Sequence, residues 1–170
     1  MVIKGKAHRF GDDVNTDYII SGRYKFKTLD MNELGRHVME DLDPEFYERL
    51  EKGDFLVAGK NFGCGSSREQ APLALKAAGV ACVLAESFAR IYFRNSINNG
   101  LPALVCDTSG IADGDQLEID LESGTIGDVT TGAEIDSGPL PGVMRGILSE
   151  GGLVEYIKKY GGLVAEREGE

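Results

Sequence analysis

Hydrophobic residues in the middle of this chain form short uninterrupted runs separated by segments with helical spacing. The runs lie at 55–58, 81–85 and 101–106, and the helical segments between them lie at 72–80 and 88–95. Short continuous apolar runs are typical of strands that are buried on both faces, as in parallel sheets. The pattern therefore predicts a β–α–β–α–β unit with a parallel sheet and right-handed crossovers.

The two ends of the chain follow different patterns. Residues 1–10 alternate apolar and basic side chains and predict an opening strand. Alternation at 116–121, a Ser-Gly turn and a second run at 125–129 predict an antiparallel hairpin with one solvent-exposed face. A last helical segment at 143–160 contains two adjacent glycines, where we expect the helix to break.

The segment between the opening strand and the parallel unit has weaker patterning. Residues 11–20 are rich in Asp and Asn and predict a loop, and Asx turns explain Asp12 and Asp13 without a bound cation. Residues 31–39 and 44–51 each have one apolar face and predict two surface helices. Asp30 is placed to cap the first of these helices.

Length, composition and charge narrow the classes of function. The 170 residues are enough for a single domain, spanning 1–170, with a sizeable core. A net charge of −10 argues against nucleic acid or an anionic membrane as the main partner. No apolar run reaches the length of a signal-peptide core or a membrane span, so the expected location is the cytoplasm.

The cysteine pattern predicts neither disulfides nor a metal site. The three cysteines, Cys64, Cys82 and Cys106, are odd in number and form no CxxC pair. Cys82 and Cys106 lie in strand-like apolar runs, where cysteine behaves as a small buried hydrophobe. The spacing of ligands for an iron–sulfur cluster is absent, so we expect no metal ligand in this chain.

The candidate chemistry is concentrated in the turn at 59–70, between the first apolar run and the helix that follows it. This turn contains Gly63, Gly65, Ser66, Ser67 and Arg68. Free backbone N–H groups and the helix dipole converge at the start of a helix and favour bound anions. The glycines allow the backbone to approach a ligand, and the planar guanidinium fits a carboxylate or phosphate.

Several other motifs share part of this pattern of residues. Ser66 with Glu69, or Ser67 with Gln70, has the spacing of a capping box, which needs no ligand. A P-loop requires a lysine before the serine, and a dinucleotide fingerprint requires a third glycine where Arg68 stands. A nucleophile elbow requires a serine between two glycines, and this turn does not have one. The combination of residues therefore favours an anion site of another kind.

A short basic and aromatic segment follows at 21–28, and it contains Arg23, Tyr24, Lys25, Phe26 and Lys27. Two interpretations are open at this point. The segment is either an edge strand with solvated lysines or a mobile loop that grips the distal part of a ligand.

Three motifs resemble the swivelling domain of the aconitase superfamily and follow its order. Gly-x-Gly-Ser-Ser-Arg-Glu at 63–69 is similar to its signature, Asn15-Thr16-Asp17 with Ile19-Ile20 to an earlier motif, and 86–101 to a later one. This resemblance implies an α/β fold with three layers, β/β/α, in which a central parallel sheet is joined to an antiparallel hairpin region.

The resemblance also implies a reaction and a partner. The length is that of a separate small subunit, as in 3-isopropylmalate dehydratase and homoaconitase. The first of these is a hydro-lyase that isomerises 2-isopropylmalate and 3-isopropylmalate in leucine biosynthesis, by dehydration and rehydration. The family implies a [4Fe–4S] cluster that acts as a Lewis acid and is bound by a large subunit, not by this chain. The alternatives are homoaconitate or another alkylmalate, such as dimethylmalate, as the substrate, and a non-catalytic anion-binding module.

The residue roles carried by the resemblance are specific. Ser66 matches the base that removes the carbon-bound proton, and its alkoxide would need stabilisation by N–H groups and Arg68. Ser67 and Arg68, with the backbone at Gly65, match the groups that hold a substrate carboxylate, and Asp17 matches an acid near the site.

The segment at 21–28 falls where family members contact the variable substituent of the substrate. Phe26 would face an isopropyl group, whereas Lys25 or Lys27 would pair with the extra carboxylate of a homocitrate-like acid. The sequence leaves both assignments open.

Overall fold

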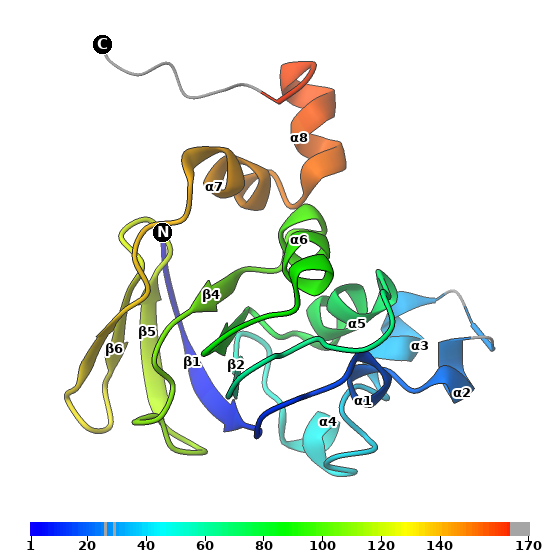
Figure 1. Ribbon diagram of the computed structural model, residues 1–170, viewed down its shortest axis with the longest axis horizontal. Coiled ribbons are helices and arrows are strands. Elements are labelled where there is room, and N and C mark those ends of the chain that lie inside the picture. Colours follow the sequence, from blue (N-terminus) through cyan, green and yellow to red (C-terminus); the bar gives the residue numbers. More distant parts are fainter. Residues whose placement is uncertain (26, 29, 164–170) are drawn as a thin grey trace.

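In the computed structural model, which describes residues 1–25, 27–28 and 30–163, a seven-stranded sheet organises the chain (Figure 1). The strands are β1 (Val2–Arg9), β2 (Phe55–Ala58), β3 (Cys82–Ala85), β4 (Ala103–Val105), β5 (Gln116–Asp120), β6 (Thr125–Asp128) and β7 (Glu134–Asp136). The helices are α1 (Thr16–Ile19), α2 (Gly22–Lys25), α3 (Met31–Gly35), α4 (Phe46–Arg49), α5 (Gln70–Ala78), α6 (Arg90–Asn98), α7 (Gly142–Ser149) and α8 (Leu153–Tyr160).

Strand β1 joins a parallel and an antiparallel half of the sheet. Its residues 7–9 pair in parallel with β2, and its residues 2–6 pair antiparallel with β5. On one side β2, β3 and β4 continue in parallel, and on the other β5, β6 and β7 continue antiparallel. The order is β4-β3-β2-β1-β5-β6-β7. The predicted parallel unit and the predicted hairpin are both confirmed, whereas the three-residue strand β7 was not expected.

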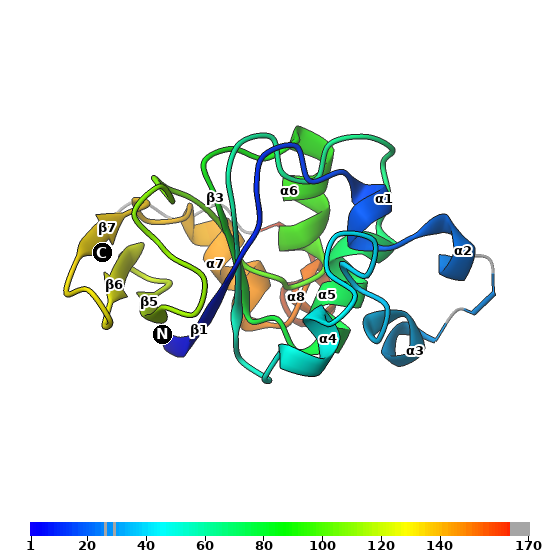
Figure 2. The ribbon, with the colours of Figure 1, turned by 90° about the horizontal axis from the view of Figure 1, so that it is seen from below.

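The two halves of the sheet and the helices form three layers. Successive residues of a strand point to opposite faces, and β2 illustrates the consequence. Phe55 and Val57 pack into a core shared with Leu117 and Ile119 of β5. Leu56 and Ala58 pack on the other face, in a core that also contains residues of α1, α3 and α5. The expected β/β/α arrangement is thus confirmed, and Figure 2 shows it from below.

Glycines end the helices where the sequence predicted. Gly79 ends α5 in the left-handed conformation, with φ of 110°, and its N–H donates to the carbonyl groups of the last turn. Gly151 and Gly152 separate α7 from α8. These two helices pack with α6 around a smaller apolar cluster of Ile97, Ile147 and Tyr156. In the described part of the chain, no helix is both long enough and apolar enough to cross a bilayer.

Several local predictions were wrong. Of the two interpretations left open for the segment at 21–28, the edge strand is wrong because Gly22–Lys25 form the short helix α2, and the expected loop at 11–20 ends in helix α1. Helices α3 and α4 are shorter than predicted, although Asp30 does cap α3 through the N–H of Asn32. Asn15 caps α1 in the same way through the N–H of Asp17. Each cap uses a side-chain oxygen to bind an N–H that has no partner within the helix.

Candidate active site

The turn after β2 is bound to the segment that leads into α1. The N–H of Gly63 donates to the carbonyl of Val14 at 2.8 Å, and the N–H of Thr16 donates to the carbonyl of Cys64 at 2.9 Å. The hydroxyl of Thr16 donates to the carbonyl of Ser66 at 2.7 Å. Two motifs that are far apart in sequence therefore form one continuous hydrogen-bonded unit at the carboxyl end of β2.

The two glycines of this turn are required by its geometry. Gly63 and Gly65 have φ of 78° and 86°, in the left-handed region that disfavours residues with a Cβ. A Cβ on Gly63 would lie 2.1 Å from Cγ of Tyr92, and a Cβ on Gly65 would lie 2.5 Å from the side-chain amide of Asn15. Both the conformation and the close packing exclude larger residues here.

The two serines are exposed and cap no helix. Helix α5 begins at Gln70, its N-cap position is occupied by Glu69, and no side chain makes a capping hydrogen bond there. The two possible capping boxes are therefore not formed.

Within the described chain, the backbone N–H groups of residues 65–70 donate to no protein acceptor. A run of free donors at the start of a nine-residue helix is a suitable environment for an anion.

Arg68 is held by α1 and the residue that follows it. Its Nη2 forms an ion pair with Oδ1 of Asp17, and its Nη1 donates to the carbonyl of Ile20 at 3.3 Å. The side chain of Arg68 is 14% exposed, whereas that of Asp17 is 52% exposed. These two contacts use two of the five N–H groups of the guanidinium, so the Nη atoms retain donors for a ligand, whereas Nε is buried and has no acceptor among the described residues.

A surface cavity of about 380 Å³ lies against these groups. One side is formed by Gly63, Gly65, Ser66, Ser67 and Arg68, together with Thr16. The other side is formed by residues 89–92, at the start of α6. The lining of the cavity thus includes Gly65, Ser66, Ser67 and Arg68, and Asp17 is connected to it through its ion pair with Arg68.

The residues of the second wall and Thr16 lie within the recognised motifs, but no individual role was predicted for them. Ala89, Arg90, Ile91 and Tyr92 belong to the third of the motifs, which was the available signal. Tyr92 is buried and its ring packs edge to face on Phe62, with the ring centroids 5.1 Å apart. Burial raises the pKa of its hydroxyl above the usual range, so Tyr92 contributes a neutral wall rather than a charged group.

The described residues of the segment at 21–28 do not line this cavity. Tyr24 stacks on His37 with the ring centroids 3.8 Å apart, and its hydroxyl donates to Oε1 of Glu40 at 2.9 Å. That hydrogen bond raises the pKa of Tyr24. Arg23 pairs with Oδ1 of Asp41 at 2.6 Å, and the ammonium of Lys27 lies 5.9 Å from the centre of the Tyr24 ring. Lys25 ends α2, and Phe26 lies outside the described residues.

The three thiols do not fit an iron–sulfur cluster. Cys82 and Cys106 are buried in the core between the two halves of the sheet, and burial raises the pKa of Cys106 to about 11. Cys64 lies in the turn, where partial burial and then the charge of Asp13 raise its pKa. A cluster is bound by thiolates, which these environments disfavour. In the described chain no group of three or more His, Cys, Asp or Glu residues could hold a metal ion.

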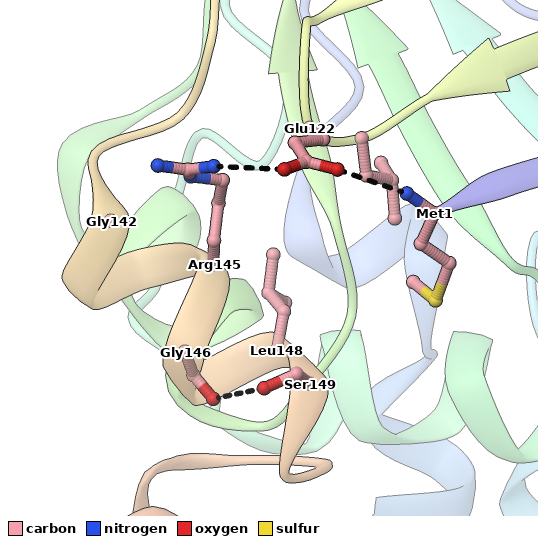
Figure 3. A pocket seen from close by; sticks show the side chains of 8 residues that line it. Met1, Glu122, Gly142, Arg145, Gly146, Leu148 and Ser149 are labelled. Atoms are coloured by element: carbon pink, nitrogen blue, oxygen red, sulfur yellow. Dashed lines mark hydrogen bonds and ion pairs between the residues drawn. The ribbon is translucent and has the colours of Figure 1, made fainter.

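A second cavity, of about 360 Å³, lies between α7 and the turn after β5 (Figure 3). Arg145 points toward Glu122, with Nη1 and Oε1 4.0 Å apart. The other carboxylate oxygen of Glu122 lies 3.9 Å from the amino group of Met1. Leu121, Leu148, Ser149 and two glycines of α7 complete the lining. None of the described candidate residues lines this cavity, so the cavity beside Ser66 is the candidate site.

Comparison with known proteins gives consistent matches over nearly the whole chain. Residues 22–108 match the family described as the aconitase C-terminal domain. The 3-isopropylmalate dehydratase small subunit 2 of Archaeoglobus fulgidus is 57% identical over 161 residues, which cover 95% of this chain and 98% of that protein. The 3-isopropylmalate dehydratase small subunit of Methanosarcina mazei is 52% identical over 167 residues, 97% of this chain and 100% of that protein.

A solved structure has the same fold. The crystal structure of 3-isopropylmalate dehydratase from Methanocaldococcus jannaschii superimposes with a TM-score of 0.91 at 49% sequence identity. The match covers 95% of this chain and 96% of that one. The likeness therefore includes both halves of the sheet and the helices around the cavity.

Proposed function

This chain belongs to the aconitase C-terminal domain family, and we propose that it is the small subunit of a 3-isopropylmalate dehydratase. Such an enzyme is a hydro-lyase that interconverts 2-isopropylmalate and 3-isopropylmalate by dehydration and rehydration. The high identity to proteins of that name over nearly the full chain supports this assignment. In this role the chain acts in leucine biosynthesis in the cytoplasm.

One observation supports the chemical role of the chain most directly. Ser66 is exposed in a cavity where Arg68 and a run of unused backbone N–H groups lie beside it. We assign Ser66 as the base that takes the proton from the substrate carbon next to the one that carries the hydroxyl. A serine alkoxide is a strong base, so its formation requires hydrogen-bond donors and positive charge that favour the anion. The turn supplies both.

Ser67 and Arg68, with the N–H groups from Gly65 onward, are assigned to a carboxylate of the substrate. The hydroxyl of Ser67 is exposed, and the guanidinium is largely buried, where charge-assisted hydrogen bonds are strong. Asp17 does not need to contact the substrate in this scheme. It orients Arg68 through their ion pair and so fixes the directions in which the unused N–H groups of the two Nη atoms point.

The remaining chemistry is assigned to a partner. We propose that a large subunit holds the [4Fe–4S] cluster, because the thiols of this chain lie in environments that disfavour ligation. When bound, the cluster supplies a Lewis acid for the substrate hydroxyl. The open cavity beside Ser66 would then be completed by the large subunit. This chain by itself is expected to bind anions weakly and to show no turnover.

The test is an activity assay on the assembled enzyme. The chain is co-expressed with the cluster-bearing large subunit of its own organism, and formation of the unsaturated diacid is followed by ultraviolet absorbance. The substrates are 2-isopropylmalate, homocitrate and 2,3-dimethylmalate, and each subunit alone is the control. Turnover of 2-isopropylmalate by the complex only is the expected result. Preference for homocitrate would reassign the substrate. Saturable anion binding by this chain alone, with no turnover by the complex, would favour a binding module.

A further inference from the structure

Thr16 is a buried residue whose hydroxyl is used at the candidate site. It is 1% exposed and follows Asn15, the cap residue of α1. Its Oγ1 donates to the carbonyl of Ser66 at 2.7 Å, and its N–H donates to the carbonyl of Cys64 at 2.9 Å. The same residue therefore fixes two carbonyl groups of the turn that carries the proposed base.

The hydrogen bond from Thr16 determines how the peptide between Ser66 and Ser67 is oriented. The described chain contains no cis peptide bond, and a trans peptide directs its N–H opposite to its carbonyl. Thr16 binds the negative end of this peptide dipole, and the N–H of Ser67 has no acceptor among the residues that the structure describes. A carbonyl oxygen turned into the cavity would repel an alkoxide or a substrate carboxylate, and the bond from Thr16 prevents that orientation.

Two adjacent residues of α1 thus hold the two key groups of the turn. Thr16 binds the backbone of Ser66, and Asp17 binds the guanidinium of Arg68. Because Thr16 and Asp17 are consecutive residues, these two contacts hold the proposed base and the proposed cation in place relative to one helix. From this geometry we propose that Thr16 is a positioning residue for Ser66, an inference that rests on the proposed function.

The chain offers a matched control for this role. Thr108 is also buried, at 0% exposure, and its Oγ1 donates to the carbonyl of Ala58, likewise at 2.7 Å. Thr108 does not line the cavity beside Ser66. Replacement of either threonine by valine removes the same kind of hydrogen bond with little change of volume. Both variants should therefore lose similar stability, and only one should lose activity.

The first measurement compares wild type, Thr16→Val, Thr16→Ser and Thr108→Val as complexes with the large subunit on 2-isopropylmalate. We expect Thr16→Val to lower kcat by about 10- to 100-fold, since small displacements of a reacting group have effects of this size, with KM changed less than about threefold. Thr16→Ser keeps the hydroxyl and should stay within about threefold of wild-type kcat. Thr108→Val should keep kcat and lower the melting temperature as much as Thr16→Val does.

The second measurement does not depend on activity. In the full chain labelled with ¹⁵N, Thr16→Val should shift the amide resonances of residues 66–68, and Thr108→Val should leave them in place. Wild-type kcat in the Thr16→Val complex, equal loss of kcat in Thr108→Val, or unmoved amide resonances would each overturn the role of Thr16. An inactive wild-type complex would count against the proposed function, and the amide resonances would still decide the role of Thr16.

Discussion

Arg68 and Asp17 form an ion pair in which the cation is mostly buried and the carboxylate is half exposed. The pair connects the turn after β2 to helix α1. A planar guanidinium held at both Nη atoms has a fixed orientation, so the N–H groups that these contacts leave unused point in fixed directions. The pair therefore sets the geometry of the proposed carboxylate site, more than the stability of the fold.

This relationship gives the first prediction. Asp17→Asn removes the charge that orients Arg68, and we expect KM for 2-isopropylmalate to rise about tenfold while kcat falls less. The melting temperature should change little, because half-exposed ion pairs contribute at most about 1 kcal/mol to stability. Steady-state kinetics of the complex and thermal unfolding of the full chain measure the two effects. A large loss of stability with unchanged KM would contradict the positioning role.

Replacement of the proposed base should separate chemistry from binding. Ser66→Ala is expected to lower kcat by about 10²- to 10⁴-fold, the range typical of lost general-base catalysis. Ser67→Ala, one residue along, should mainly raise KM because Ser67 is assigned to a substrate carboxylate. Both side chains are exposed, so thermal unfolding should be close to that of wild type. Similar kinetics in the two variants would reject the division of roles between the serines.

The close contact between Gly63 and Tyr92 predicts a site that tolerates no side chain. Gly63→Ala forces a Cβ into the left-handed region and toward the buried ring, so we expect a loss of about 3 kcal/mol in the free energy of unfolding. Gly110→Ala is the control, because a Cβ there would meet no atom within 4 Å. That control should change stability by less than about 0.5 kcal/mol. Urea denaturation of the three proteins measures the difference.

A buried pair at the opposite end of β2 predicts a dependence of stability on pH. Oδ2 of Asp54 lies 2.7 Å from Nε2 of His8, and the carboxylate also accepts the N–H groups of Lys6 and Glu51. Burial by itself raises the pKa of Asp54, but these hydrogen bonds outweigh it and the pKa is lowered. The contribution of Asp54 to stability is therefore present above its pKa in the unfolded chain, about 3.9, and is lost as the pH falls through its lower pKa in the folded chain.

Asp54→Ala tests this relationship. The variant leaves the buried His8 ring and two N–H groups without their acceptor, and we expect it to lose about 3 kcal/mol of stability at pH 7. Its stability should fall less steeply than that of wild type as the pH is lowered from 5 toward 2. Urea denaturation across this range gives both values. The kinetics of the complex should be nearly unchanged, since Asp54 precedes β2 and the candidate site follows it.

The sequence alone determined the order of most strands and helices, because the spacing of apolar residues reflects which side of each element is buried. The runs at 55–58 and 81–85 have the bounds of β2 and β3 to within a residue, and the paired glycines at 151–152 separate two helices as predicted. The turn at 63–68 was recognised for the same local reason. Its glycines, serines and arginine are neighbours in the chain, so their combination is visible without a fold.

Only the tertiary structure decided how that turn is held and what faces it. The capping boxes at 66–70 fit the local spacing, but Thr16 holds the carbonyl of Ser66 and Asp17 holds Arg68, so the helix begins only at Gln70. The wall formed by residues 89–92 is likewise supplied by a separate helix. Local patterns encode hydrogen bonds and burial within an element. The partner that competes for a given carbonyl or guanidinium is selected by packing between segments that lie far apart in the chain.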